Sequence, residues 1–287
     1  MRDCFLRFPG GKPKAFTMSY DDGVRADIRL AQICCQYGVK CTFNVNSGMM
    51  HSEPGHHRLC ADEIRQHLQG RGHEIAVHGF NHQAPGAARP TAAIGSVLED
   101  RKALEKTFGG IIRGMAYPDT GITKIHPGTN YETIRRILQD LGIAYARSLG
   151  GDNDNFLLPQ DWYNWIPTAH HKNPAVLEYA EKFAGLDPNT MYSSACYPRL
   201  FYLWGHSYEF DRDDNWDRIE AILQILAGRE DTWYPTNIQL RNYVAAYESL
   251  IFSADGNVIY NPSLQEIWLN VDGTGCSIKP GETLSLE

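Results

Sequence analysis

The chain has 287 residues, of which 43% are hydrophobic, and a formal net charge of −7. This composition supports a substantial core, and the absence of a lysine/arginine cluster argues against nucleic acid and anionic membranes as partners. No apolar run approaches the length of a membrane span. The length fits one large domain or a domain with a small appendage.

The cysteine content and the first residues bear on the cellular compartment. Seven cysteines form an odd set without a C-x-x-C pair, which favours reduced thiols. Charges at Arg2, Asp3 and Arg7 interrupt what would have to be the apolar part of a signal peptide. We therefore expect a cytoplasmic protein, unless a leader precedes this sequence.

Residues 16–23 (Phe-Thr-Met-Ser-Tyr-Asp-Asp-Gly) indicate a buried strand that ends in two carboxylates and a glycine. Successive side chains of a strand point to opposite faces, so Asp21 and Asp22 can have different tasks. One could bind a metal while the other takes a proton. An isolated Asp-Asp-Gly is more often a simple turn, so this interpretation depends on the rest of the chain.

Strand and helix patterns alternate along most of the sequence. Helices are expected at 24–37, 61–70, 90–108, 130–141, 213–227 and 237–250, and strands at 40–46, 72–77, 111–117, 143–146 and 199–205. Repeated β-α units predict a parallel sheet. The fold class expected is therefore α/β, as a distorted or incomplete (β/α) barrel, with an open doubly wound sheet as the alternative.

The pattern changes after residue 250. Short alternating runs separated by Asp-Gly, Asn-Pro and Pro-Gly pairs predict a small β appendage. We expect a barrel domain over 1–250 and an appendage over 251–287 that packs on it. The appendage either mediates a homo-oligomer or covers one end of the barrel.

Two histidines follow the strand expected at 72–77. His78 and His82 are four residues apart, so they lie on one face if the backbone turns helically, and they can then share a metal. Tyr117 and His206 also follow strands directly. Because the carboxyl ends of parallel barrel strands open on one face, these residues should meet the two aspartates. The histidines at 51, 56 and 57 are interpreted as a solvated loop instead.

Together these residues predict a hydrolytic metal site. Asp22, His78 and His82 would hold a divalent ion, with zinc as the default and cobalt, manganese, nickel or iron(II) as alternatives. Asp21 could take a proton from water, and His206 could protonate a leaving group.

These motifs resemble the polysaccharide deacetylase family (carbohydrate esterase family 4, the NodB homology domain). The resemblance is carried by Ser19-Tyr20-Asp21-Asp22-Gly23, by Lys40-Cys41-Thr42-Phe43, by the stretch from Gly72 to His82 and by Leu203-Trp204-Gly205-His206. It implies a metal-dependent, distorted β/α barrel with Asp21 as general base, Asp22, His78 and His82 as metal ligands, and His206 as general acid. It also implies an oxyanion stabilised by the metal and by a backbone N–H after the fourth strand.

The chain departs from the family pattern after that strand, where it reads Met115-Ala116-Tyr117-Pro118-Asp119-Thr120-Gly121. The arginine that would steady the base is missing, and Arg113 lies three residues upstream of Ala116. Asp119 stands where the family has a tyrosine, so its N–H would be the oxyanion donor. Asp161-Trp162 matches the family's tryptophan motif only loosely, which leaves Asp161 an uncertain partner for His206.

The expected function is removal of an acetyl group from an N-acetylated sugar or oligosaccharide. Tyr117, Asp119, Asp161, Trp162 and Trp204 are the candidate substrate-binding residues. One alternative is hydrolysis of an O-acetyl ester or of a small non-sugar amide. Another is an inactive sugar-binding relative, in which tryptophans form a platform for the sugar.

Overall fold

A computed structural model describes residues 2–149, 153–189 and 196–286. Its main feature is an eight-stranded parallel sheet with the order β6-β5-β4-β3-β2-β8-β7, in which β9 also pairs with β2. The strands are β2 (Lys14–Asp21), β3 (Thr42–Val45), β4 (Glu74–Val77), β5 (Gly114–Ala116), β6 (Tyr145–Arg147), β7 (Ala169–His170), β8 (Arg199–Gly205) and β9 (Thr232–Trp233). Among the described residues no ladder joins β6 to β7, so the barrel is incomplete. The sheet is a curled half-barrel, and the predicted fold class is confirmed.

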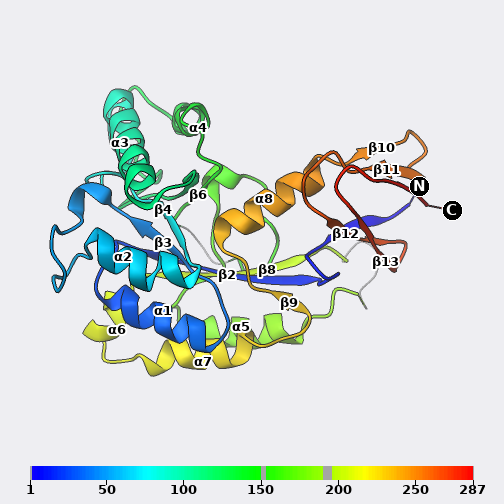
Figure 1. Ribbon diagram of the computed structural model, residues 1–287, viewed down its shortest axis with the longest axis horizontal. Coiled ribbons are helices and arrows are strands. Elements are labelled where there is room, and N and C mark those ends of the chain that lie inside the picture. The colour runs from blue at the N-terminus through cyan, green and yellow to red at the C-terminus, as the bar shows by residue number, and fades with distance from the viewer. Residues whose placement is uncertain (1, 150–152, 190–195, 287) are drawn as a thin grey trace.

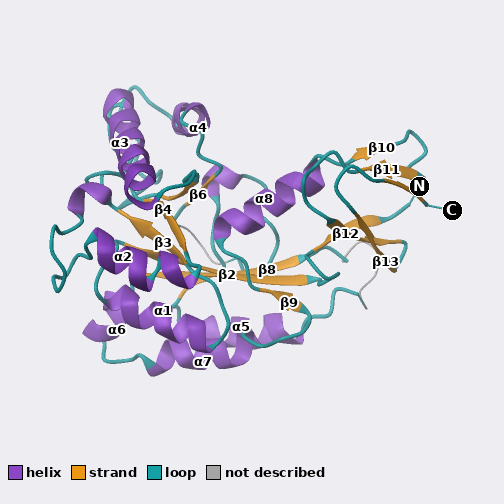
Figure 2. Cartoon of the chain, viewed as in Figure 1, coloured by secondary structure: helices purple, strands orange, loops and turns teal. Residues whose placement is uncertain are grey.

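Helices cover both sides of this sheet (Figures 1 and 2). They are α1 (Ala26–Gln36), α2 (Ala61–His67), α3 (Pro90–Phe108), α4 (Tyr131–Asp140), α5 (Val176–Gly185), α6 (Tyr208–Arg212), α7 (Asp217–Leu226) and α8 (Asn237–Glu248). Three short 3-10 helices are η1 (Ser47–Met49), η2 (Gln69–Arg71) and η3 (Trp162–Asn164). Within the described ranges, no helix is both long and apolar enough to cross a membrane.

Most predicted elements are found within a few residues of their expected ends. The helix expected over 213–227 differs, because Asp214 has a left-handed φ of 46° and separates α6 from α7. Helices α5 and α6 and strands β7 and β9 lie outside the predicted elements. Two- and three-residue strands leave too short an apolar pattern to be recognised in a sequence.

The central strand β2 sets the position of the site. All eight of its residues are buried, as expected for a strand with parallel neighbours on both sides. Its register places Asp21 beside Asn44 of β3 and Tyr20 beside Gly205 of β8. The residues that follow β2 and β8 therefore emerge at the same edge of the sheet.

The appendage contains two small antiparallel sheets. One consists of β10 (Ile251–Phe252), β11 (Val258–Tyr260) and β14 (Thr283–Ser285), and the other of β12 (Ile267–Val271), β13 (Thr274–Ile278) and β1 (Cys4–Arg7). Strand β1 comes from the opposite end of the chain, so both termini lie at the appendage (Figure 1). Residues 4–7 thus pair with the appendage, although the expected division assigned them to the barrel.

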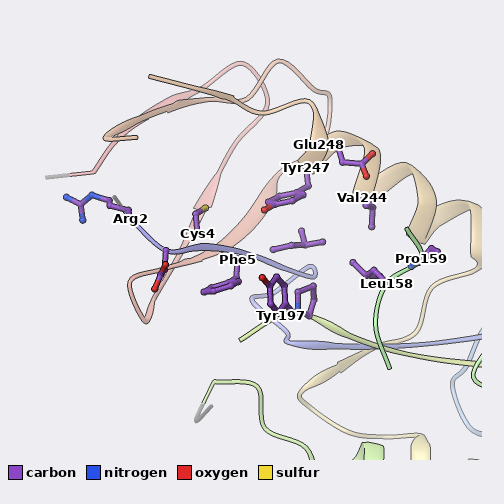
Figure 3. Close-up of a pocket in the computed structure, with 12 residues that line it drawn as sticks. Arg2, Cys4, Phe5, Leu158, Pro159, Tyr197, Val244, Tyr247 and Glu248 are labelled. Atoms are coloured by element: carbon purple, nitrogen blue, oxygen red, sulfur yellow. The ribbon is translucent and has the colours of Figure 1, made fainter. Parts of the chain in front are cut away.

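A shared apolar cluster connects the appendage to the barrel. Leu6 and Leu269 of the appendage pack in one cluster with Tyr243 of α8 and Tyr202 of β8. A cavity of about 540 Å³ lies at this junction, lined mainly by β1, α8 and residues near 158 and 197 (Figure 3). Its lining contains none of the predicted site residues.

Candidate active site and metal centre

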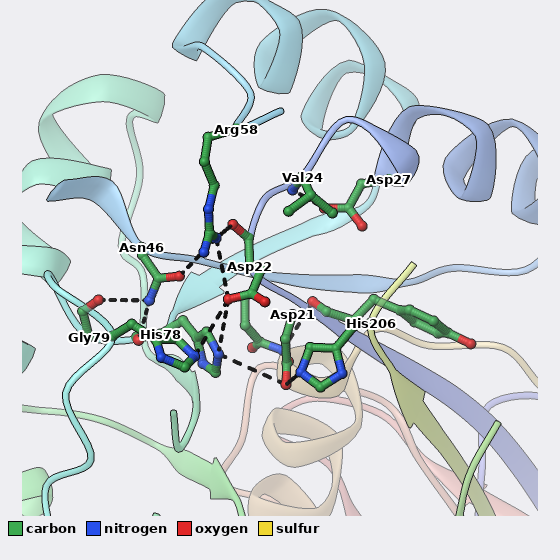
Figure 4. A network of polar contacts seen from close by, with 12 residues as sticks. Asp21, Asp22, Val24, Asp27, Asn46, Arg58, His78, Gly79 and His206 are labelled. Carbon is green, nitrogen blue, oxygen red and sulfur yellow. Dashed lines mark hydrogen bonds and ion pairs between the residues drawn. The ribbon is translucent and has the colours of Figure 1, made fainter. Parts of the chain in front are cut away.

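Asp21 lies at the end of β2, in the middle of a buried polar cluster (Figure 4). Its Oδ1 accepts a hydrogen bond of 2.8 Å from Asn44, and its Oδ2 is 3.9 Å from the Nε2 atoms of both His78 and His206. Burial alone would raise the pKa of this carboxyl, but Arg147, His78 and His206 outweigh it and lower the pKa. Asp21 is therefore ionised at neutral pH.

Arg147 provides the guanidinium that the sequence motif lacked. Arg147 is the last residue of β6 and is fully buried. Its Nη2 donates to Asp21 Oδ2. The Trp204 ring lies against it, with its centroid 4.2 Å from the guanidinium carbon. Arg113, the residue considered from the sequence, instead donates to the carbonyl of Gly142 at an exposed position.

Asp22 leaves the strand with a left-handed φ of 89°, which is strained for any residue with a side chain. Such a conformation costs about 1–3 kcal/mol and tends to occur at functional sites. The Asp22 N–H donates to the carbonyl of Asn44 at 2.9 Å, and the Arg58 guanidinium donates to the carbonyl of Asp22. The turn thereby directs Asp22 toward the histidines that follow β4, while Asp21 faces Arg147.

The two histidines lie on a turn rather than on a helix. Gly79 and His82 have left-handed φ values of 74° and 56°, and the two imidazole centroids are 5.0 Å apart. His78 Nδ1 is 2.9 Å from the carbonyl of Ala116, which can only accept, so Nδ1 carries the proton and Nε2 keeps its lone pair. The backbone N–H of His78 also donates to Oδ2 of Asp100, on α3, at 2.9 Å.

These three side chains fit a metal ion. One ligand atom from each of Asp22, His78 and His82 lies within 4.8 Å of the others. His78 Nε2 is buried and has no hydrogen-bond partner among the described residues, and buried Asp22 Oδ1 accepts no hydrogen bond there although Arg58 Nη1 lies 3.3 Å from it. Orphaned buried acceptors are costly unless another group satisfies them, and a divalent cation would do so.

His206 follows β8 on the opposite side of Asp21. Its Nδ1 is 3.6 Å from Oε2 of Glu209, one turn further along the chain. Burial lowers the pKa of His206, but the carboxylates of Glu209 and Asp21 outweigh it and raise the pKa. His170, 3.1 Å away, and His206 hold the pKa of Glu209 below its usual range despite burial. His206 is thus kept available as a proton donor.

His170, His206 and Glu209 form a second group with metal-ligand spacing. His170 Nδ1 accepts the backbone N–H of Lys172 at 3.1 Å, so the proton of the neutral ring is on Nε2. His170 therefore presents a donor, and no lone pair, to Glu209. Glu209 Oε2 lies at ion-pair distance from His170, His171 and His206, at 3.1, 3.5 and 3.6 Å, but accepts no hydrogen bond from the described residues. We interpret this group as a carboxylate paired with histidines rather than as a second metal centre.

The structure places the expected substrate-binding residues in different surroundings. Asp161 accepts from the Tyr131 hydroxyl at 2.5 Å and from the Tyr163 N–H at 2.9 Å, so the carboxylate beside His206 is Glu209 and not Asp161. Trp162 is buried against Trp165, with ring centroids 4.9 Å apart.

The other three candidates lie at or near strand ends. Tyr117 is buried, and its hydroxyl donates a hydrogen bond to the carbonyl of Tyr163. Asp119 is exposed and has a left-handed φ of 50°. Trp204 contacts the His170 ring edge to face at 4.5 Å. Of the five, Trp204 is the one that contacts both Arg147 and the His170 ring beside Glu209.

Comparison with known proteins agrees with this arrangement. The polysaccharide deacetylase family model matches residues 9–146, a segment that contains Asp21, Asp22, His78 and His82. No curated protein matches the chain.

Several solved structures share the fold. A probable polysaccharide deacetylase from Pseudomonas aeruginosa PAO1 is 14% identical, covers 82% of this chain and 92% of its own, and gives a TM-score of 0.57. Puue allantoinase is also 14% identical, with coverages of 82% and 91% and a TM-score of 0.55.

The Xyl-CE4 domain of a xylanase from the hindgut metagenome of Trinervitermes trinervoides is 15% identical, with coverages of 81% and 92% and a TM-score of 0.51. At such identities these structures speak for the fold alone. The family match is the independent finding, and it shows that residues 9–146 of this chain are similar to polysaccharide deacetylases.

Proposed function

We propose that this protein is a metal-dependent hydrolase that removes the acetyl group from an N-acetylated sugar or oligosaccharide. The observation that carries the proposal is the position of Asp21. An ionised, buried carboxylate lies 3.9 Å from a candidate metal-binding histidine on one side and 3.9 Å from His206 on the other. A base between a metal set and an acid is what hydrolysis of an acyl group requires.

Asp22, His78 and His82 would hold the cation, for which zinc is the default and cobalt, manganese, nickel or iron(II) are also suited. When bound, such an ion supplies a Lewis acid beside the acyl carbonyl. The backbone N–H of Asp119, after β5, is the proposed second stabiliser of the developing oxyanion.

The side chains of this protein would handle the protons. Asp21 accepts a proton from the water whose oxygen bonds to the acyl carbon, and Arg147 holds the carboxylate in place. His206 donates a proton to the sugar nitrogen as the C–N bond breaks. The products are acetate and a free amine. Asp21 and His206 must be ionised and protonated together, which their opposite pKa shifts allow.

A second candidate is hydrolysis of an amide that is not on a sugar. It is favoured by the shared fold of Puue allantoinase and by Asp119 in place of the family's tyrosine. An O-acetyl esterase would use the same residues on a different acyl group. An inactive sugar-binding relative is disfavoured, because binding alone requires neither Asp21 nor His206.

Rates of hydrolysis on three substrate classes test the proposal. The rate of acetate release from N-acetylated chito-oligosaccharides should exceed the rate of acetate release from O-acetylated xylo-oligosaccharides. It should also exceed the rate at which the ring of allantoin is hydrolysed. Asp21→Asn should abolish the reaction, whereas Asp62→Asn, on a side chain that is 91% exposed on α2, should not. Preference for allantoin would move the assignment to the second candidate, and full activity of Asp21→Asn would refute the mechanism.

A further inference from the structure

One face of the sheet is polar behind the proposed base. Thr17, Ser19 and Asp21 occupy alternate positions of β2 and therefore point to the same face. Asn44 lies beside Asp21 on β3, and Tyr202 lies beside Thr17 on β8. All five residues are buried. Buried polar groups are costly unless they are hydrogen-bonded, so this layer has to satisfy its own donors and acceptors.

Asn44 stands at the end of this layer that meets the base. Its Nδ2 donates to Asp21 Oδ1 at 2.8 Å and to Ser19 Oγ at 2.7 Å, with a longer contact of 3.4 Å to the carbonyl of Tyr20. An amide nitrogen has two protons, and both are used here. The Oδ1 of Asn44 is buried with no hydrogen-bond partner among the described residues. Because such an acceptor destabilises the folded state, stability alone does not explain this side chain.

A chain of hydrogen bonds continues from Ser19 away from the site. A side-chain hydrogen bond joins Ser19 to the Tyr202 hydroxyl, which also accepts from Asn237 Nδ2 at 2.6 Å. Asn237 Oδ1 accepts from the Thr17 hydroxyl at 2.8 Å. Asn237 is the first residue of α8, and its backbone N–H donates to Thr42 Oγ1 at 3.0 Å. Buried groups therefore connect the base to the N-terminus of a helix.

The two oxygens of the Asp21 carboxylate are held by different partners. Oδ2 accepts from Arg147, and Oδ1 accepts from Asn44. A single hydrogen bond leaves a carboxylate free to turn about that contact, whereas one bond to each oxygen fixes its plane. Proton transfer needs a base at the right distance and angle from the water, so the plane of this carboxylate bears directly on the rate.

We infer that Asn44 is a positioning residue for the proposed base, and that Ser19, Tyr202 and Asn237 fix the orientation of its amide. Asn44 acts through Asp21 and has no contact with the reacting atoms. This inference rests on the proposed function and extends it to what holds the base in place.

Kinetics on N-acetylated chito-oligosaccharides test this role. Asn44→Leu has nearly the same shape but no donor, and should lower kcat about 10- to 100-fold, the loss expected for one hydrogen bond to a charged group. KM should change by less than about twofold, because the change is in the turnover step. Tyr202→Phe should lower kcat about three- to tenfold. Tyr243→Phe is the control, since it removes another buried hydroxyl, which donates to the carbonyl of Arg7, and should leave kcat unchanged.

Metal content separates a displaced base from a damaged metal site. All three variants should retain the metal content of the wild type. A fall in kcat that accompanies a loss of metal would place the effect on the metal ligands and refute the positioning role. If Asn44→Leu does not fold, Tyr202→Phe provides the same comparisons.

Crystal structures separate this inference from the proposed function, because they need no turnover. The Asp21 carboxylate should be turned or occupy two conformations in Asn44→Leu, and should keep its wild-type position in Tyr243→Phe. An unmoved carboxylate or a wild-type kcat in Asn44→Leu would refute the positioning role and leave the deacetylase proposal intact. A displaced carboxylate in Asn44→Leu, when the wild type releases no acetate, would support the positioning of Asp21 and reject the proposed reaction.

Discussion

Arg147 provides the sharpest test of how this site is built. Replacing it with methionine keeps an unbranched apolar stem against Trp204 but removes the only fully buried cation that contacts Asp21 among the described residues. The carboxylate of Asp21 then stays buried with only the hydrogen bond from Asn44 and the two neighbouring histidines. We expect Arg147→Met to destabilise the protein and to disturb the base.

The size of the effect follows from burial. Both side chains of the pair are almost completely inaccessible, at 0% for Arg147 and 3% for Asp21. Breaking such a pair by removing one partner costs about 3–5 kcal/mol, because it leaves an uncompensated charge. That is a large part of the roughly 5–15 kcal/mol by which folded domains are stable. The pKa of Asp21 should also rise, which moves the acid limb of the pH–rate profile to higher pH.

Urea unfolding and the pH dependence of kcat/KM measure the two effects separately. Arg113→Met is the matched control, since Arg113 donates to Gly142 at an exposed position and should change neither quantity. Adding Asp21→Asn to Arg147→Met should recover part of the lost stability, because the unpaired charge is removed. An Arg147→Met variant as stable as the wild type, with an unmoved acid limb, would refute the reasoning.

Three further changes probe the surroundings of the site. Glu209→Gln should move the basic limb of the pH–rate profile to lower pH, since Glu209 raises the pKa of His206; an unmoved limb would remove Glu209 from this role. Burial raises the pKa of Asp27 to about 8 from 3.8, so the folded state binds this proton more tightly and loses stability as pH rises between these values. Asp27→Asn should remove a slope of about 1.4 kcal/mol per pH unit from the free energy of unfolding between pH 5 and 7, and an unchanged slope would show that Asp27 titrates normally. Gly205→Ala should cost about 1–3 kcal/mol in urea unfolding, because its Cβ would lie 2.0 Å from Nδ1 of His171; an undiminished midpoint would mean that His171 moves aside freely.

The sequence predicts the strand-end residues well because their signal is local. Asp21, Asp22, His78 and His206 each follow an apolar run, and in a parallel sheet this suffices to bring them to one edge. Arg147 also follows a predicted strand, so the same rule could have identified it. The family pattern, however, has its arginine after β5, whereas in this protein the pair with Asp21 joins residues 126 positions apart.

Other features depend on backbone conformation or on pairing across the whole chain. The histidine turn uses left-handed φ values at Gly79 and His82, which spacing alone could not distinguish from a helical turn. Strand β1 pairs with residues near 270, and no local pattern reveals such a partner. Glu209 is three residues after His206, a spacing that would have indicated contact if α6 had been recognised.

The central claim is that Asp22, His78 and His82 hold a catalytic divalent metal. The most direct measurement is the metal content of purified protein, for the wild type, His78→Ala and the control His51→Ala, together with acetate release before and after chelation. We predict about one metal per chain in the wild type and control, none in His78→Ala, and activity that chelation abolishes and zinc or cobalt restores. Full acetate release from metal-free protein, or unchanged metal content in His78→Ala, would contradict this account.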